Sequence, residues 1–316
     1  MTLDQFEDIF YKRLKDAYEP QCTSVTKSTI DKNNETISCL ILRRDFSGIG
    51  ITIYPRDFHE MWENGSTMEE LMLKIKEDIM TKQIPEFDIH RLYKEGAEDQ
   101  LISCVVGYEK NKSWLATTPH ERIQDMAIYA RWEISDEASL RITDEILGNL
   151  KMTKEEMLLI AKENRKRTAV LQPMETVLFH LMEPEELNRT FTGTFDRNIV
   201  KCSPYDLYVL GSSKPTHGAA VGMDLDVLKA VHKCLDDDFY LLPSSIHETL
   251  AIPKSTWDHG VEALRKMVRD VNGSDVPLQD QLTDSVYEFD GNKLKLAGAE
   301  QKMTVGTSME GHRHRR

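Results

Sequence analysis

The stretch MAIYARWEI, residues 126–134, sets the expected fold class of this 316-residue chain. Its residues Met126, Ile128, Ala130, Trp132 and Ile134 recur at every second position, which is the period of a β-strand with one buried face. Helical patterns lie elsewhere in the sequence and do not overlap this strand. The chain is therefore expected to separate its strands and helices into layers, as α+β proteins do.

On the N-terminal side of this strand, the sequence predicts two helices and several strands. Thr2 with Gln5 and Ser66 with Glu69 have the spacing of a capping box, in which the first side chain and the fourth satisfy each other's backbone N–H groups. Apolar residues at helical spacing follow each pair. The runs that read as strands are 36–43, 49–54 and 101–107.

On the C-terminal side, helical patterns begin at Thr153, near Val227 and at Ser255. Short apolar runs separated by Pro, Ser, Gly and Asn predict two β-hairpins, because these residues suit tight turns. The expected strands are 206–210, 239–242, 247–252, 286–289 and 293–296.

These patterns predict an α+β protein of two lobes, built from mixed helices and mostly antiparallel strands, with a disordered C-terminal tail. The lobes are expected at residues 1–137 and 138–297. Residues 298–316 lose all periodicity and end in GHRHRR, so they are predicted to form a flexible basic tail.

Composition excludes several classes of function. The chain has 40 Lys and Arg against 53 Asp and Glu, a net charge of −13. This acidic balance argues against binding to nucleic acids and to anionic membranes, which need clustered positive charge. Five cysteines without a C-x-x-C pair predict reduced thiols. Because no secretory signal or apolar spanning segment is visible, we expect a cytoplasmic location without a membrane partner.

Motifs for common chemistries are missing from the sequence. It lacks a phosphate-binding P-loop, a nucleophile elbow and a dinucleotide-binding glycine pattern. The His-Glu pairs at 59–60 and 247–248 lack the second histidine that a zinc site of that type needs. We therefore expect no cofactor and no metal, and the sequence favours a non-enzymatic module that binds another protein or a ligand.

The segment PSSIHE, residues 243–248, supports an alternative function. Ser245 and His247 would point to one face of an extended chain, with Glu248 nearby. A serine and a histidine in this arrangement could form the activated nucleophile of a hydrolase. Against this, residues two apart seldom reach in-line geometry, and no glycine for an oxyanion hole accompanies them. An ordinary turn followed by an edge strand explains the same residues.

Arginines near the expected strands are candidates for ligand binding. Arg43 and Arg131, with Ser244 in the polar turn, could hold a carboxylate or phosphate through paired hydrogen bonds. Salt bridges to the abundant Asp and Glu side chains are the simpler interpretation. A further alternative is association with nucleic acid through the arginines of the tail.

Several segments resemble an uncharacterised family, a domain of unknown function frequent in anaerobic Gram-positive gut bacteria. The resemblance covers about residues 1–296 and implies a bacterial origin, but no activity, ligand or catalytic residue. This chain departs from the family pattern at residues 46–50, where a proline and polar residues are more usual. The segments that carry the resemblance are 42–54, 74–79, 206–210, 218–220, 238–248, 267–272 and 284–287.

Overall fold

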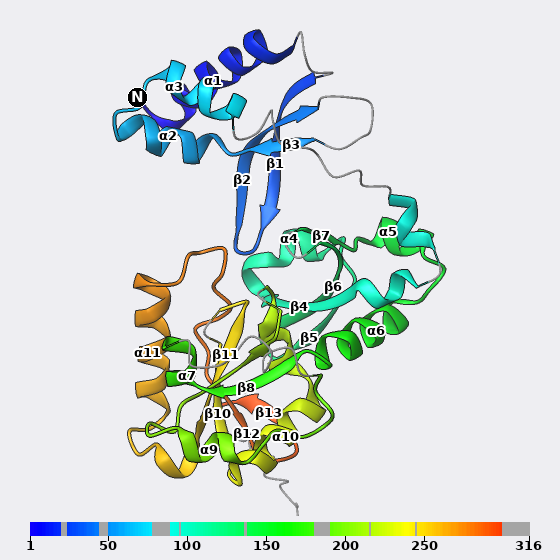
Figure 1. Ribbon diagram of the computed structural model, residues 1–316, viewed down its shortest axis with the longest axis vertical. Helices are drawn as coiled ribbons and strands as arrows, with labels where there is room; N and C mark the ends of the chain where they lie inside the picture. Colours follow the sequence, from blue (N-terminus) through cyan, green and yellow to red (C-terminus); the bar gives the residue numbers. More distant parts are fainter. Residues whose placement is uncertain are drawn as a thin grey trace, which may run out of the picture.

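Three antiparallel sheets and the helices around them make up the structure, a computed structural model (Figure 1). The predicted α+β class with mostly antiparallel strands is confirmed. Ser244, a predicted candidate, and most of the predicted tail lie outside the described residues. The structure describes residues 1–19, 24–43, 50–77, 89–94, 96–135, 138–179, 190–214, 216–243 and 245–298.

The N-terminal sheet has the order β1-β2-β3 and carries three helices on one face (Figure 1). Phe6, Phe10 and Leu14 of the first helix pack against Leu40 and Leu42 of the central strand, and all five are buried. The elements are α1 (Leu3–Tyr18), β1 (Ser24–Lys32), β2 (Glu35–Arg43), β3 (Ile51–Ile53), α2 (Pro55–Glu63) and α3 (Met68–Ile75).

Two local features of this part correct the sequence prediction. The capping box of α3 is Thr67 with Glu70, one residue later than predicted, because the N–H of Ser66 already bonds Met61 and closes the preceding turn. Strand β1 escaped prediction because it lies at the sheet edge and buries only Val25, so it has no apolar pattern.

The middle sheet contains the strand from which the fold class was predicted. In β6, the residues Met126, Ile128 and Ala130 are buried as expected, but Ala127 and Tyr129 on the opposite face are buried too. The prediction of one buried face is wrong there, because Trp114 and its neighbours cover the second face. The elements are η3 (Ile89–Tyr93), η4 (Ala97–Gln100), β4 (Leu101–Gly107), η5 (Glu109–Asn111), α4 (Lys112–Leu115), β5 (His120–Ile123), β6 (Met126–Ser135), β7 (Ala138–Arg141), α5 (Asp144–Asn149) and α6 (Lys154–Lys166).

The third sheet has six strands in the order β13-β12-β10-β11-β9-β8, and both predicted hairpins are present in it. The helix predicted from Ser255 begins later, at Val261, because Gly260 has a positive φ of 76° that a helix does not admit. The elements are β8 (Ala169–Pro173), α7 (Met174–Leu178), α9 (Asn198–Cys202), β9 (Tyr208–Ser212), η6 (Gly218–Met223), α10 (Leu225–Leu235), β10 (Phe239–Leu242), β11 (Glu248–Pro253), η7 (Lys254–Thr256), α11 (Val261–Ser274), β12 (Tyr287–Phe289) and β13 (Leu294–Leu296).

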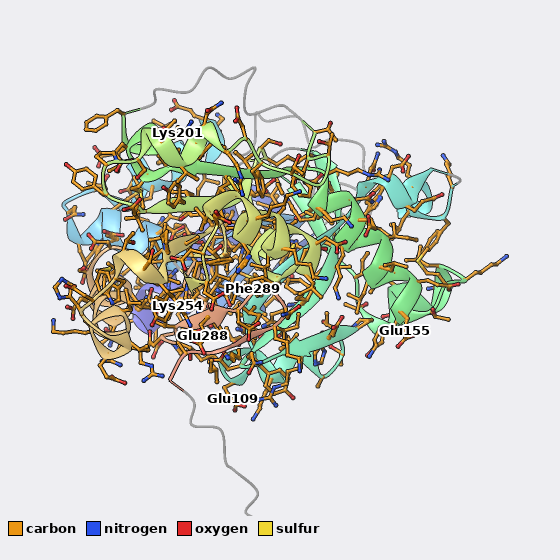
Figure 2. All side chains as sticks on the ribbon, turned by 90° about the horizontal axis from the view of Figure 1, so that it is seen from below. Glu109, Glu155, Lys201, Lys254, Glu288 and Phe289 are labelled. Atoms are coloured by element: carbon orange, nitrogen blue, oxygen red, sulfur yellow. The ribbon has the colours of Figure 1, made fainter. Side chains whose placement is uncertain are left out.

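The middle and C-terminal sheets share one hydrophobic core. Val105 and Ile128 of the middle sheet pack in the same cluster as Phe239 and Phe289 of the C-terminal sheet. Figure 2 labels Phe289 beside Glu288, whose carboxylate accepts a 2.6 Å hydrogen bond from Lys254. Strands β6 and β7 pair across residue 137, and the division into lobes at that residue stays a prediction.

The β1–β2 hairpin connects the N-terminal sheet to the rest of the molecule (Figure 1). Its turn, Asn33-Asn34, donates side-chain hydrogen bonds to the backbone carbonyls of Leu278, Gln279 and Gln281. Asn111, which is fully buried, bonds both turn residues. In the described ranges, the two parts of the chain therefore meet through a polar contact, and no hydrophobic cluster includes residues of both.

Candidate functional site

The Ser245 hydroxyl is committed to local hydrogen bonds. Ser245 is 6 % exposed, and its Oγ donates to Glu248 Oε1 at 2.9 Å. The same oxygen accepts from the backbone N–H groups of His247 and Glu248, at 2.9 and 3.4 Å. The structure thus brings Ser245 and Glu248 together as a turn that opens β11. No histidine ring in the described part of the chain bonds Ser245 Oγ.

His247 faces another histidine instead. Its ring lies 6.3 Å from that of His217, measured between centroids. Its Nε2 is 3.5 Å from Asp280 Oδ1, while its Nδ1 is buried with no hydrogen-bond partner among the described residues. His247 therefore has one nitrogen near a carboxylate and one available for a further hydrogen bond.

His217 is held in place by the backbone that follows β9. It adopts the left-handed conformation, with φ 55° and ψ 27°, and Gly218 after it lies against the His247 carbonyl and the Ser212 N–H. Burial, together with the nearby positive charges of Arg131 and Arg165 and the ring of His247, lowers the pKa of His217 to about 3. His217 is consequently neutral at physiological pH.

Arg165, on α6, is the charged residue most deeply enclosed in this region. Only 1 % of it is exposed. Its Nε and Nη1 donate to Ser103 O and Ser212 Oγ, both at 3.3 Å, but Nη2 is buried without a partner among the described residues. Strand β4 is at a sheet edge, which leaves the Ser103 carbonyl free to accept. A buried guanidinium N–H without an acceptor is costly and calls for an explanation.

Arg131 belongs to the same region, whereas Arg43 does not. Arg131 donates from Nε to Ser139 Oγ at 2.7 Å and from Nη2 to Ser139 O at 2.8 Å. Its positive charge is one of the causes that lower the pKa of His217. Arg43 ends β2 at the opposite end from the Asn33-Asn34 turn, roughly 25 Å along the strand. Of the candidates predicted from the sequence, Arg131 and His247 therefore lie in the same region of the structure, and Arg43 lies elsewhere.

We name Arg131, Arg165, His217 and His247 the arginine–histidine cluster. Sequence reasoning missed two of its members. Arg165 continues the buried positions Met157 and Ala161 of α6 at a spacing of four, and an arginine on an apolar helix face is the signal that was available. His217 carried no such signal, because a histidine between Thr216 and Gly218 is typical of an ordinary loop.

The chemistry that this cluster offers is donation of hydrogen bonds and positive charge. The nearest thiol, Cys104, is fully buried, and burial raises its pKa to about 11, so it is protonated and unreactive. No group of three or more His, Cys, Asp or Glu side chains within the described ranges could hold a metal ion. The arrangement suits an anion, because guanidinium and imidazole groups bind carboxylates and phosphates.

Larger cavities elsewhere in the molecule do not indicate a different anion site. Two cavities of about 340 and 370 Å³ are lined by residues around Leu92 and around Phe191. Among the described residues that line them, no charged side chain is buried. A water-sized cavity of about 10 Å³ adjoins Arg165. The buried, unsatisfied charge of Arg165 is thus what marks the site.

Replacing Arg165 with methionine is expected to raise the free energy of unfolding by about 1 kcal/mol. Removal of a buried N–H without a partner and of an unpaired charge should outweigh the loss of the two long hydrogen bonds, both 3.3 Å, to Ser103 O and Ser212 Oγ. Urea denaturation would measure the change. Arg131→Met is the matched control. Because its hydrogen bonds to Ser139 are formed, its loss should destabilise by about 2 kcal/mol. A similar loss of stability in both variants would contradict this view of Arg165.

Comparison with known proteins gives one finding. The model of a family described as "Family of unknown function (DUF5688)" matches residues 3–291. No curated protein and no solved structure matches the chain.

Proposed function

As the chain belongs to this family of unknown function, DUF5688, we propose that it is a non-enzymatic module that binds a small anionic ligand, a carboxylate or a phosphate, at the arginine–histidine cluster. The observation that carries the proposal is the Arg165 guanidinium. It is almost wholly buried, and one of its N–H groups has no acceptor among the described residues.

The charges around Arg165 support an anionic ligand. No ion pair joins Arg165 to a carboxylate in the part of the chain that the structure describes. Glu133, the nearby acid on β6, is already paired with Lys214. An uncompensated buried positive charge costs stability, and a role in function is one reason for a protein to retain such a cost. An oxyanion would supply both the missing acceptor and the missing charge.

The remaining functional alternatives have less support. The hydrolase hypothesis stays a prediction, and the hydrogen bonds of Ser245 to Glu248 and to the backbone favour a structural role for that hydroxyl. Association with nucleic acid through the tail concerns residues 312–316, outside the described residues. A cytoplasmic location and a bacterial source also stay predictions. None of the helices that the structure describes is long and apolar enough to span a bilayer.

Calorimetric titration with sulfate, inorganic phosphate and acetate tests the proposal. The protein is expected to bind at least one of these anions saturably, and Arg165→Met is expected to weaken that binding at least thirtyfold, the effect of losing one or two charge-assisted hydrogen bonds. Arg269→Met, which removes an exposed arginine of α11, should leave binding unchanged.

Either of two results would overturn the proposal: no saturable binding of any of the three anions, or equal affinities in the wild-type protein and Arg165→Met. Urea denaturation of each variant shows whether a loss of binding reflects unfolding.

A further inference from the structure

We propose that strand β1 pairs with β1 of a second copy of this chain, antiparallel and centred on Thr29, so that two N-terminal sheets join into one continuous sheet. The surface involved belongs to the N-terminal sheet and is independent of the proposed anion site. An open strand edge, the direction of its backbone groups and the charges along it support this pairing.

The outer edge of β1 is open. The strand lies at the edge of its sheet and pairs with β2 along all nine residues. Among the described residues, no backbone group outside β2 bonds to it. Thr26, Lys27 and Thr29 are exposed. A long edge strand is a template for another strand unless a proline or a bulge interrupts it, and β1 contains neither.

The hairpin shows which backbone groups of β1 face outward. Lys32 and Glu35 flank a two-residue turn and are paired with each other. In such a hairpin this pair exchanges backbone hydrogen bonds, and every second residue before Lys32 likewise bonds to β2. The residues between them direct their N–H and C=O groups away from the sheet. Toward the middle of the strand, these are Lys27, Thr29 and Asp31.

Two contacts in the structure agree with this alternation. The Tyr11 hydroxyl donates to the carbonyl of Val25, which belongs to the outward-facing set, at 3.4 Å. Asp31 Oδ1 accepts a hydrogen bond from Thr36 Oγ1 at 2.7 Å. Asp31 and Thr36 are opposite each other, and side chains lie closer in pairs that do not exchange backbone hydrogen bonds.

Charge favours one register of the pairing. With Thr29 on the two-fold axis, Lys27 lies directly opposite Asp31 of the second copy, and the same pair recurs on the other side of the axis. Three residue pairs then exchange backbone hydrogen bonds. Moving the axis by one residue in either direction places Lys27 opposite an uncharged residue. Opposite charges that face each other across a strand pair are favourable, so they select the axis at Thr29.

Both charged groups can accept a second partner. Lys27 Nζ donates to Asp8 Oδ1 at 2.6 Å, and an ammonium group has two further N–H donors. Asp31 uses Oδ1 for Thr36, and its Oδ2 has no hydrogen bond within the described ranges. A lysine on an edge strand usually discourages pairing. Here an aspartate of the second copy lies opposite it and reverses that effect.

The position of the N-terminal sheet leaves room for a second copy. The sheet projects from the other two and meets them at the Asn33-Asn34 turn, at one end of β1 (Figure 1). Nine residues of β-strand span roughly 30 Å. Because the pairing is antiparallel, the remaining parts of the two copies would lie at opposite ends of the joined strands.

Sedimentation equilibrium of the full chain tests the pairing. Salt at about 0.15 M screens the repulsion between two chains that each carry a net charge of −13. Because an interface between two strand edges is small, we expect a reversible dimer at protein concentrations up to about 100 µM. Lys27→Glu and Asp31→Lys each place like charges opposite at both positions. Each variant should weaken dimerisation at least about tenfold.

An equimolar mixture of these two variants is the decisive sample. In the mixed dimer, the new glutamate of one chain faces the new lysine of the other, and the native pair is kept on the other side of the axis. The mixture should therefore dimerise within about threefold of the wild-type affinity. Lys266→Glu is the matched control. It reverses an exposed charge of α11, away from β1, and should leave dimerisation unchanged.

Thr29→Pro tests the backbone contribution. Proline removes an N–H group at the axis that faces outward, so the hydrogen bonds between β1 and β2 are kept. This variant should remain monomeric at about 100 µM, and urea denaturation should show that it is folded.

Each outcome decides for or against the pairing. A wild-type chain that stays monomeric up to about 100 µM overturns the proposal. Dimerisation that Lys27→Glu, Asp31→Lys or Thr29→Pro leaves unchanged also overturns it, because another surface then joins the copies. A mixture that stays as weak as its two components overturns the register centred on Thr29. Recovery in the mixture supports it and cannot come from unfolded variants.

Discussion

Gly218→Ala is expected to destabilise the protein by about 4 kcal/mol, because the added methyl group has no room. A Cβ built at this position would overlap the carbonyl oxygen of His247 and would lie 2.8 Å from the backbone nitrogen of Ser212. Both neighbours are backbone atoms, so no side chain can move aside. Relief would require β9 and the turn before β11 to separate.

Urea denaturation of the wild-type protein and two glycine variants would measure this effect. Gly273→Ala is the matched control. It lies in α11 with open space where the added methyl group would sit, and alanine should stabilise that helix by about 0.5–1 kcal/mol. If Gly218→Ala were as stable as the wild-type protein, the close packing of His217 and His247 on which the site depends would be wrong.

The elements that sequence patterns predicted correctly are those marked by a local apolar pattern. Residues 101–107 are β4 with the predicted bounds, and all seven residues are buried. The hairpin joining β10 to β11 likewise follows from apolar runs on either side of a Pro-Ser-Ser turn. Strand β1 was missed because eight of its nine residues are not buried, which leaves no apolar pattern to detect.

The candidate site was only partly predictable, because the fold and not the local sequence brings its residues together. The turn from Ser245 to Glu248 spans four residues, and a local pattern pointed to it. Arg165 and Ser212 bond across 47 positions of sequence, and nothing in either segment indicates the other. The end of α6, which carries Arg165, meets the end of β9, which carries Ser212. This contact depends on how the middle and C-terminal sheets share their core.

Net charge gives no information on a buried site for a related reason. The total of −13 is an average over 316 residues, and most of the acidic groups are on the surface. The arginine–histidine cluster is a local exception inside an acidic protein. An acidic exterior disfavours long polyanions such as nucleic acids but still allows a small anion to bind at a few buried donors.

Asn111→Ala is expected to lower the free energy of unfolding by about 3 kcal/mol, because one fully buried side chain makes five hydrogen bonds. Its Oδ1 accepts from the backbone N–H of Asn34 at 2.8 Å and from the Trp114 indole at 2.9 Å. Its Nδ2 donates to Asn33, Asn34 and the carbonyl of Gly107. Alanine would leave buried donors and acceptors from both parts of the chain without partners.

Urea denaturation followed by tryptophan fluorescence would measure this loss, and Trp114, which bonds Asn111 directly, should report a change of environment. Asn149→Ala is the control, since that exposed side chain makes one bond within its own helix and should change stability by less than about 0.5 kcal/mol. If Asn111→Ala lowered the free energy of unfolding by less than about 1 kcal/mol, the contact between Asn111 and the β1–β2 turn would not exclude water. Water would then replace the asparagine, and the β1–β2 turn would not fix the N-terminal sheet to the rest of the protein.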